Sequence, residues 1–283
     1  LNPTYFANYI DFNVIFLLIS MMIIVLITTR SGVFNWIANE LLKFTKGHPV
    51  KILCVLGLFT AITSSFLDNV TTVILVMPIT FVIAKTLELD PIPFLITEIV
   101  SSNIGGTATL IGDPPNIIIG SAGGLSFMDF IKELTPIIAI ILLAVIIVLS
   151  FIFKKKLHAN PEKMAEISNI DNSHTITDKS LMIRSTITLG LVILGFMTHD
   201  ITHISTCVAA MFGAAFLLVF EKPSEIFKEV EWNTIFFFVG LFIIIGGLEA
   251  TGGIRLMAEW IIKVTQGSQA ATSMLILWAS GLI

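Results

Sequence analysis

The sequence predicts an all-α, polytopic membrane protein. Of its 283 residues 55% are hydrophobic and only 13% are charged, and the mean hydropathy is +0.94. Soluble globular domains carry about 25% charged residues. Long apolar runs recur along the chain, and some are interrupted by glycine, proline and polar residues. We therefore expect a multi-pass protein of a cell membrane, inner or plasma, whose functional site lies at the interruptions.

Residues 1–153 are predicted to form a first structural repeat, which begins with a span. Residues 12–29 are an uncharged run, close to the roughly 20 residues that a spanning helix needs. Residues 33–46 alternate apolar and polar side chains at helical spacing. That pattern predicts a helix that lies in the membrane interface.

A hairpin is predicted at residues 51–84. Two apolar arms flank the polar tip at residues 68–72, and the second arm, residues 73–84, is too short for a span and contains Pro78. Arms this short favour a re-entrant hairpin over two complete spans.

Residues 91–122 are apolar but cannot form one continuous helix. Three glycines loosen the backbone, and Pro114 and Pro115 each remove an N–H donor. In lipid such a break survives only inside protein or beside a wet cavity. We expect two half-helices, 91–103 and 116–122, around oxygen-bearing side chains of the kind that bind ions together with freed carbonyls: Ser101, Ser102, Asn103, Thr107, Thr109, Asp113 and Asn116.

The rest of the chain predicts a span at 136–153, a polar, mobile linker at 154–180 and the start of a second repeat at 181–283. The expected elements of the second repeat are spans at 181–197, 204–220 and 234–248, an interfacial helix at 254–266 and an apolar arm from residue 270.

Lys and Arg residues are unevenly divided between the two faces of this topology. Six spans, with the broken helix counted as one, and one hairpin place 13 of the 16 basic residues on one side. Cytoplasmic loops are enriched in Lys and Arg, so this side is predicted to be cytoplasmic. The linker 154–180 would then be cytoplasmic, and the hairpin would enter from the cytoplasm.

An internal repeat supports this organisation. Residues 13–63 align without gaps onto residues 233–283, with ten identities in 51 positions and the same order of elements. The topology orients the two copies oppositely, and inverted repeats with broken helices are typical of secondary transporters. On this offset Asp68 would map beyond Ile283, so we expect the second half to be incomplete, without its hairpin and broken helix.

Two motifs carry a resemblance to a known family: residues 65–78, SFLDNVTTVILVMP, and residues 103–116, NIGGTATLIGDPPN. Here the chain resembles the ArsB/NhaD family of the ion transporter superfamily, which includes arsenite permeases, NhaD-type antiporters, citrate-transporter-like proteins and the melanosomal P protein. The motifs look most like those of the P protein and its bacterial relatives. The resemblance implies an elevator-type fold with two inverted halves, each giving one hairpin tip and one unwound helix to the site.

Asp68 and Asp113 are the strongest candidates for ion binding, because a charge at membrane depth costs at least ~2.5 kcal/mol. The structural alternative is that each caps a helix or a turn. Glu98, on the same helix face as Gly105, either relays a proton or is a hydrogen-bonded carboxyl. The expected ion- or substrate-binding set, whose amides and hydroxyls could instead satisfy freed backbone groups, is Asp68, Asn69, Thr71, Thr72, Ser102, Asn103, Gly105, Gly106, Thr107, Gly112, Asp113 and Asn116. A Na⁺ ion would be bound at Asp68, Asn69, Asn103 and Asp113, and no other metal is expected.

The sequence therefore predicts a secondary active transporter, not an enzyme. Its substrate would be a small ion, an anion of the arsenite type or Na⁺, coupled to H⁺ or Na⁺. An intramembrane aspartyl protease stays open as an alternative, although Leu110 stands where that family's Gly-x-Gly-Asp motif has glycine, and so does a passive ion channel. No cofactor is expected apart from the coupling ion. The expected partners are the lipid bilayer, a small inorganic ion or small carboxylate as substrate and, as an open alternative, a second copy in a homodimer; no nucleic acid is expected.

Overall fold

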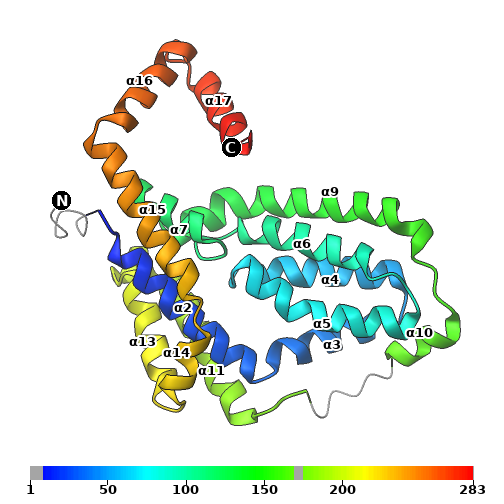
Figure 1. Cartoon of the computed structure of the whole chain (residues 1–283). Helices are drawn as coiled ribbons and strands as arrows, with labels where there is room; N and C mark the ends of the chain where they lie inside the picture. The colour runs from blue at the N-terminus through cyan, green and yellow to red at the C-terminus, as the bar shows by residue number, and fades with distance from the viewer. Residues whose placement is uncertain (1–8, 169–174, 283) are drawn as a thin grey trace. The chain divides into compact units, whose positions relative to one another are not determined.

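The computed structural model describes residues 9–168 and 175–282, and all regular secondary structure in these ranges is helical (Figure 1). Five stretches within them are long and apolar enough to cross a membrane: Phe12–Arg30, Asn69–Leu87, Phe127–Lys156, Lys179–Met197 and Trp232–Ala250. The predicted all-α, polytopic class is confirmed.

The chain divides into two compact units, a small unit of residues 1–15 and 231–283 and a large unit of residues 16–230. The helix α2 (Phe12–Arg30) contributes to both. The large unit continues with α3 (Val33–Phe44), α4 (Pro49–Ser64), α5 (Asn69–Leu87), α6 (Ile92–Gly106), α7 (Pro114–Gly123), α8 (Phe127–Asp129), the π-helix η1 (Phe130–Leu134), α9 (Thr135–Phe153), the 3₁₀ turn η2 (Lys154–Lys156), α10 (Pro161–Ser168), α11 (Lys179–Met197), α12 (His199–Thr202), α13 (Thr206–Leu218) and α14 (Pro223–Glu229). The small unit holds α15 (Trp232–Ala250), α16 (Gly253–Thr265) and α17 (Gln269–Leu282).

Two predicted elements differ in length from the observed helices. The second arm of the hairpin is longer than the predicted 73–84, because α5 has 19 residues, starts at Asn69 in the tip and runs through Pro78. A proline inside a packed helix bends it without necessarily ending it, since neighbouring helices hold both sides. The span predicted at 204–220 is the shorter α13, whose start is fixed by Ser205: the Ser205 hydroxyl accepts a hydrogen bond from the Val208 amide.

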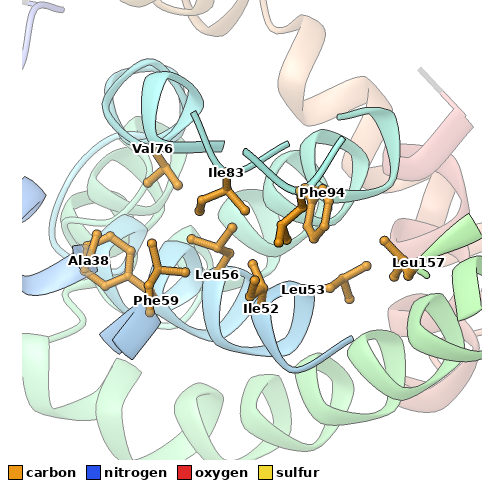
Figure 2. Close-up of a cluster of buried hydrophobic side chains, with 11 residues drawn as sticks. Ala38, Ile52, Leu53, Leu56, Phe59, Val76, Ile83, Phe94 and Leu157 are labelled. Carbon is orange, nitrogen blue, oxygen red and sulfur yellow. The ribbon is translucent and has the colours of Figure 1, made fainter. Parts of the chain in front are cut away.

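The apolar core of the large unit joins α3, α4, α5 and α6. Figure 2 shows Leu56 and Phe59 of α4 gathered with Val76 of α5 and Phe94 of α6. Val76 and Phe94 are completely buried, and close packing of such side chains holds helices together in a membrane, where lipid is as apolar as the side chains themselves. The hairpin α4–α5 and the first half-helix α6 are therefore held together as one packed body.

The predicted linker is partly folded. After η2, Leu157 is only 4% exposed and belongs to the core cluster (Figure 2). The helix α10 packs against α3 and α5, and Lys163 lies 3.6 Å from the carboxylate of Glu88. Residues 169–174 of the predicted linker lie outside the described residues. The predicted linker thus contains a packed segment, because Leu157 anchors a stretch whose composition is polar.

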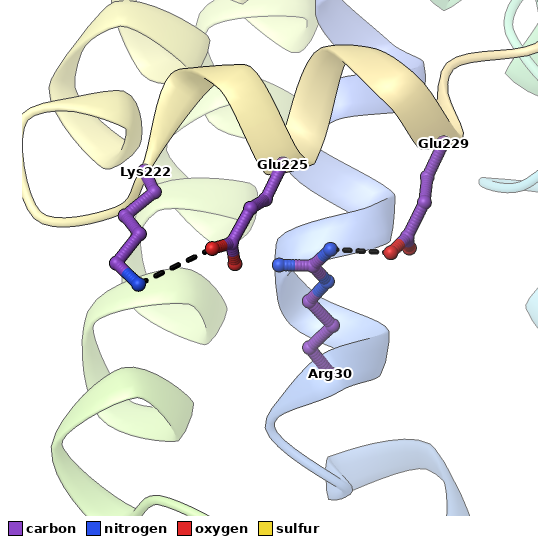
Figure 3. Close-up of polar contacts among 4 residues, drawn as sticks. All are labelled: Arg30, Lys222, Glu225 and Glu229. Atoms are coloured by element: carbon purple, nitrogen blue, oxygen red, sulfur yellow. Dashed lines mark hydrogen bonds and ion pairs between the residues drawn. The ribbon is translucent and has the colours of Figure 1, made fainter.

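Ion pairs fix the far end of the large unit at its surface (Figure 3). Arg30, in the last turn of α2, lies 2.5 Å from Glu229 at the end of α14, and Lys222 lies 3.2 Å from Glu225. Both pairs are exposed to solvent, where a pair contributes at most about 1 kcal/mol. The Arg30–Glu229 pair links α14 to α2, whereas the Lys222–Glu225 pair lies within the start of α14 itself.

The internal repeat is visible in the local backbone. The helices α2 and α15 have the same length, and the starts of α15, α16 and α17 follow those of α2, α3 and α4 at one constant offset, the offset of the sequence alignment. Gly32 and Gly252, which precede the amphipathic helices, have φ angles of 83° and 76°. Only glycine adopts such angles readily. Each copy therefore turns at the same corner, while the inverted orientation stays a prediction.

Candidate functional site

The hairpin tip is built around the start of α5. Asp68 occupies the N-cap position, and its Oδ1 accepts a hydrogen bond from the Thr71 amide at 2.9 Å. The structural alternative for Asp68 is therefore observed. Asp68 also lines a small cavity of about 30 Å³ together with Phe66 and Pro114.

Asp68→Ala in the full-length protein should destabilise the hairpin. Alanine cannot accept from the Thr71 amide, so we expect a loss of about 1 kcal/mol. Asp68→Asn keeps an oxygen acceptor and should change stability little. Melting temperatures of the two purified variants in detergent measure this difference, and equal melting temperatures would show that the cap contributes nothing.

The helix break is shorter than the sequence predicts. The helix α6 continues to Gly106 and α7 begins at Pro114, so only residues 107–113 are outside the helices. Ser101, Ser102 and Asn103 lie in α6, as the predicted half-helix 91–103 implies, and Asn116 lies in the first turn of α7. Proline suits the first turn of a helix because the N–H groups of that turn have no helical partner anyway. The stretch that loses helical hydrogen bonds is thus narrower than its glycine and proline content suggests.

Asn69 connects the hairpin tip to the break. Its Nδ2 donates to Asp113 Oδ2 at 3.2 Å and lies 3.4 Å from Asn103 Oδ1. Its Oδ1 lies 2.7 Å from the hydroxyl of Ser64, which is also 2.8 Å from the Ser102 carbonyl. The structure thus brings together Asn69, Asn103 and Asp113, three of the four residues expected to bind Na⁺. Asp68, the fourth, immediately precedes Asn69.

The Asp113 carboxylate makes few hydrogen bonds to the residues around it. It stands at the N-cap position of α7, but its side chain makes no capping bond. Pro114 and Pro115, the next two residues, have no N–H to offer. The Asp113 carboxylate is half-buried, and within the described residues its one hydrogen bond comes from Asn69. Asp68 caps its helix through a side-chain hydrogen bond, whereas Asp113 makes no such bond, so a purely structural role is less well supported for Asp113.

Side chains satisfy several carbonyls that the break leaves open. The single amide group of Asn116 donates to Gly106 O at 3.0 Å and to Thr109 O at 2.8 Å. The Thr109 hydroxyl donates to the Ser65 carbonyl, and the Thr135 hydroxyl donates to Ala108 O at 2.8 Å. Asn116 is therefore a positioning residue of the break. Ser64 and Thr135 were not anticipated, and their only signal in the sequence is a small polar residue at the end of an apolar run.

Glycines let three backbones approach one another at the site. A Cβ atom at Gly105 would lie 2.1 Å from Ala61 O of α4, and one at Gly106 would lie 2.3 Å from Asn69 Oδ1. A Cβ at Gly112 would lie 2.5 Å from Gly106 O. Because these three glycines have no side chain, the hairpin tip and the break can come into contact.

The remaining predicted residues are more peripheral. The Ser102 hydroxyl donates to Ile99 O and the Thr107 hydroxyl to Asn103 O, both within α6 and its end. Thr71 contributes its backbone amide to the Asp68 cap. Thr72 is completely buried in α5. No described group of three or more His, Cys, Asp or Glu side chains could hold a metal ion.

Comparisons with known proteins agree with this architecture. The CitMHS family, described as citrate transporters, matches residues 1–283. An uncharacterized transporter of Mycobacterium bovis is 41% identical over 276 residues, which is 97% of this chain and 64% of that protein. A 46 kDa membrane protein of Mycobacterium leprae is 40% identical over the same coverage. The mouse P protein is 28% identical over 358 residues, covering 99% of this chain and 43% of the P protein.

The chain thus spans somewhat less than two thirds of the length of its mycobacterial relatives. The matches to the P proteins of mouse and human confirm the resemblance that the two motifs carry. Since the family match covers every residue, the chain belongs to the CitMHS citrate transporter family.

Proposed function

We propose that this chain forms half of the translocation site of a secondary active transporter, and that the half-site at Asn69, Asn103 and Asp113 binds the coupling cation, Na⁺ or H⁺. The observation that carries the proposal is the Asp113 carboxylate, which is half-buried and bonded only to an amide within the described residues. A carboxylate beside an amide oxygen, here Asn103 Oδ1, and unwound backbone is typical of a cation site at the midplane of a transporter. Asn69, whose Nδ2 donates to both oxygens, would hold them in position.

The same geometry disfavours an anion at this half-site. Helix N-termini attract anions through free N–H groups and a partial positive charge. Here the N-terminus of α5 is already occupied by Asp68, and α7 begins with two prolines. Residues 68–72 and 103–116 contain no Lys or Arg. Two carboxylates at two helix starts would repel an anion unless a cation were bound first.

The transported species would then be a small anion that follows the cation. The matching family is described as citrate transporters, so a small carboxylate is the first candidate, and arsenite and chloride follow. The cavity of about 30 Å³ beside Asp68 has space for one or two waters or a bare cation, since one water needs ~10–15 Å³. Citrate would need space beyond this half-site.

The packed body of α4, α5 and α6 would carry the ion across the membrane. The hairpin tip and the break are joined through Asn69 and through the close approach of Gly105 to Ala61. Movement of this body as a unit would expose the site alternately on each side.

Transport by the full-length protein in proteoliposomes tests the proposal. A Na⁺ or H⁺ gradient should drive uphill accumulation of citrate, arsenite or chloride, tested in turn, and an ionophore that collapses the gradient should abolish it. Flux that runs only downhill, without dependence on either gradient, would overturn the proposal and indicate a channel.

A further inference from the structure

Glu98 is a buried carboxyl that the proposed cation site does not use. It lies in the middle of α6 and is completely inaccessible to solvent. Its Oε1 accepts a hydrogen bond from the hydroxyl of Thr80 on α5. Its Oε2 has no partner among the described residues. One carboxyl oxygen of Glu98 is thus held by a hydrogen bond, and the other has no hydrogen-bond partner within the described residues.

No cation neutralises Glu98 within the described part of the chain. The helices that pack against α6 are α4, α5 and α9. Their titratable groups are Lys51 and Cys54 on α4 and Lys85 on α5, while α9 has none. Both lysines are exposed, and the Cys54 thiol lies 3.3 Å from the Ser150 hydroxyl. Because an ionised carboxylate is very costly in such surroundings, burial favours the protonated form of Glu98.

Three further buried hydroxyls lie on α4, α5 and α6. Ser101 Oγ, Thr60 Oγ1 and Thr72 Oγ1 are buried and have no partner among the described residues. Ser101 follows Glu98 by one helical turn and lies against Gly57, where a Cβ would be 3.1 Å from Ser101 Oγ. Buried polar atoms in native proteins are normally bonded to protein or ordered water. The three hydroxyls and the Glu98 Oε2 are therefore groups that ordered water would satisfy.

This set of groups, which we name the polar seam (Thr60, Thr72, Thr80, Glu98 and Ser101), points toward the hairpin tip. On α6, Glu98, Ser101 and Gly105 share one face by their spacing. On α4, Thr60 precedes Ser64 by one turn, and Ser64 contacts Asn69. On α5, Thr72 and Thr80 share a face, and Thr72 lies in the first turn next to the tip. The seam therefore runs from Glu98 to the Asn69–Asp113 pair within one packed body.

We propose that Glu98 is a proton-binding site separate from the cation site, and that waters held by the hydroxyls of the seam connect it to the hairpin tip. The Oε2–H bond of Glu98 breaks, the proton passes to water and along the seam, and the carboxylate keeps the electron pair until a proton returns. The proposal deepens the proposed function, because it supplies a carrier for the proton of a coupled transporter. One carboxyl oxygen with scattered hydroxyls suits a proton better than a hard metal cation, which takes six or more oxygens.

Infrared difference spectroscopy of the purified full-length protein tests the proton site without any transport substrate. Stepping the pH should reversibly remove the C=O band of a buried carboxylic acid from the native protein. The band should be absent from Glu98→Gln, which keeps an acceptor for Thr80, and present in Asp113→Asn. Ser101→Ala should keep the band but slow its response to a pH step. This variant tests the proposal if Glu98→Gln does not fold.

The outcomes separate the two proposals. A Glu98 band that persists at every pH until the protein unfolds would overturn the proton site and leave a structural carboxyl. The proton site would also be overturned if the Glu98 band responded to added Na⁺ at constant pH but did not respond to a change of pH. A reversible band in a protein that transports nothing would leave the proton site standing and remove the proposed transport function.

Discussion

An Asp113→Asn variant of the full-length protein should insert and fold normally yet lose coupled transport. Asparagine has the size of aspartate and starts a helix equally well, and it can still accept a hydrogen bond from Asn69. It cannot supply a negative charge to a cation. Because cation affinity depends on the charge of the ligands, we expect Na⁺ binding to weaken by at least about tenfold, or about 1.4 kcal/mol. Isothermal titration with Na⁺ and gradient-driven uptake in proteoliposomes measure both effects.

Asp68→Asn is the matched control for this substitution. Asp68 also precedes a helix, but one of its oxygens is committed to the Thr71 amide. We expect its replacement by asparagine to weaken Na⁺ binding less than the replacement of Asp113 does. Normal gradient-driven uptake by Asp113→Asn would remove Asp113 from the cation site and leave Asp68 as the acidic ligand.

Gly105→Ala should strongly destabilise the protein, although alanine is the better helix former. A helical Gly→Ala change gains about 1 kcal/mol from propensity. Here the new Cβ would lie 2.1 Å from Ala61 O and 2.5 Å from Ala61 Cα, which are backbone atoms that cannot rotate away. The helices α4 and α6 would have to separate, and overpacking of this kind costs typically about 1–3 kcal/mol and occasionally more. We expect a net loss of about 2 kcal/mol and a lower melting temperature in detergent.

Gly190→Ala on α11 is the control, since no described atom lies within 4 Å of a Cβ at that position. That variant should be as stable as the native protein or slightly more stable. If Gly105→Ala melted at or above the temperature of Gly190→Ala, the close contact between α4 and α6 would be wrong, and with it the packed body that joins the tip to the break.

The sequence predicts where the chain is interrupted because glycine and proline act locally. The break before α7 follows from Pro114 and Pro115, and the hairpin tip follows from the polar residues 68–72 between two apolar arms. The corners at Gly32 and Gly252 are seen only in the backbone of the structure. The extent of each interruption was harder to predict, since tertiary packing extends α5 through Pro78 and α6 through Gly105. Local rules give the place of a break but not its width.

The contacts that assemble the site could not be predicted from local patterns. Ser64 contacts Ser102 only because α4 and α6 pack closely, and it contacts Asn69 because the hairpin tip brings the start of α5 back to the end of α4. The Thr80–Glu98 bond likewise depends on the register between α5 and α6. The folded part of the 154–180 segment was missed because its anchor, Leu157, is a single apolar residue among polar ones.

The two glycine corners differ in their surroundings, and this difference bears on how each can diverge in evolution. At Gly32 a side chain would meet Thr175 O at 2.0 Å, whereas at Gly252 no described atom lies within 4 Å. The first corner is restricted both by its φ angle and by its neighbour, so glycine is the only residue that fits. The second is restricted by its φ angle alone, which asparagine and aspartate also tolerate. Lineages of this family can therefore replace glycine at the second corner while the first stays fixed, and a duplication can fade from the sequence while its backbone is retained.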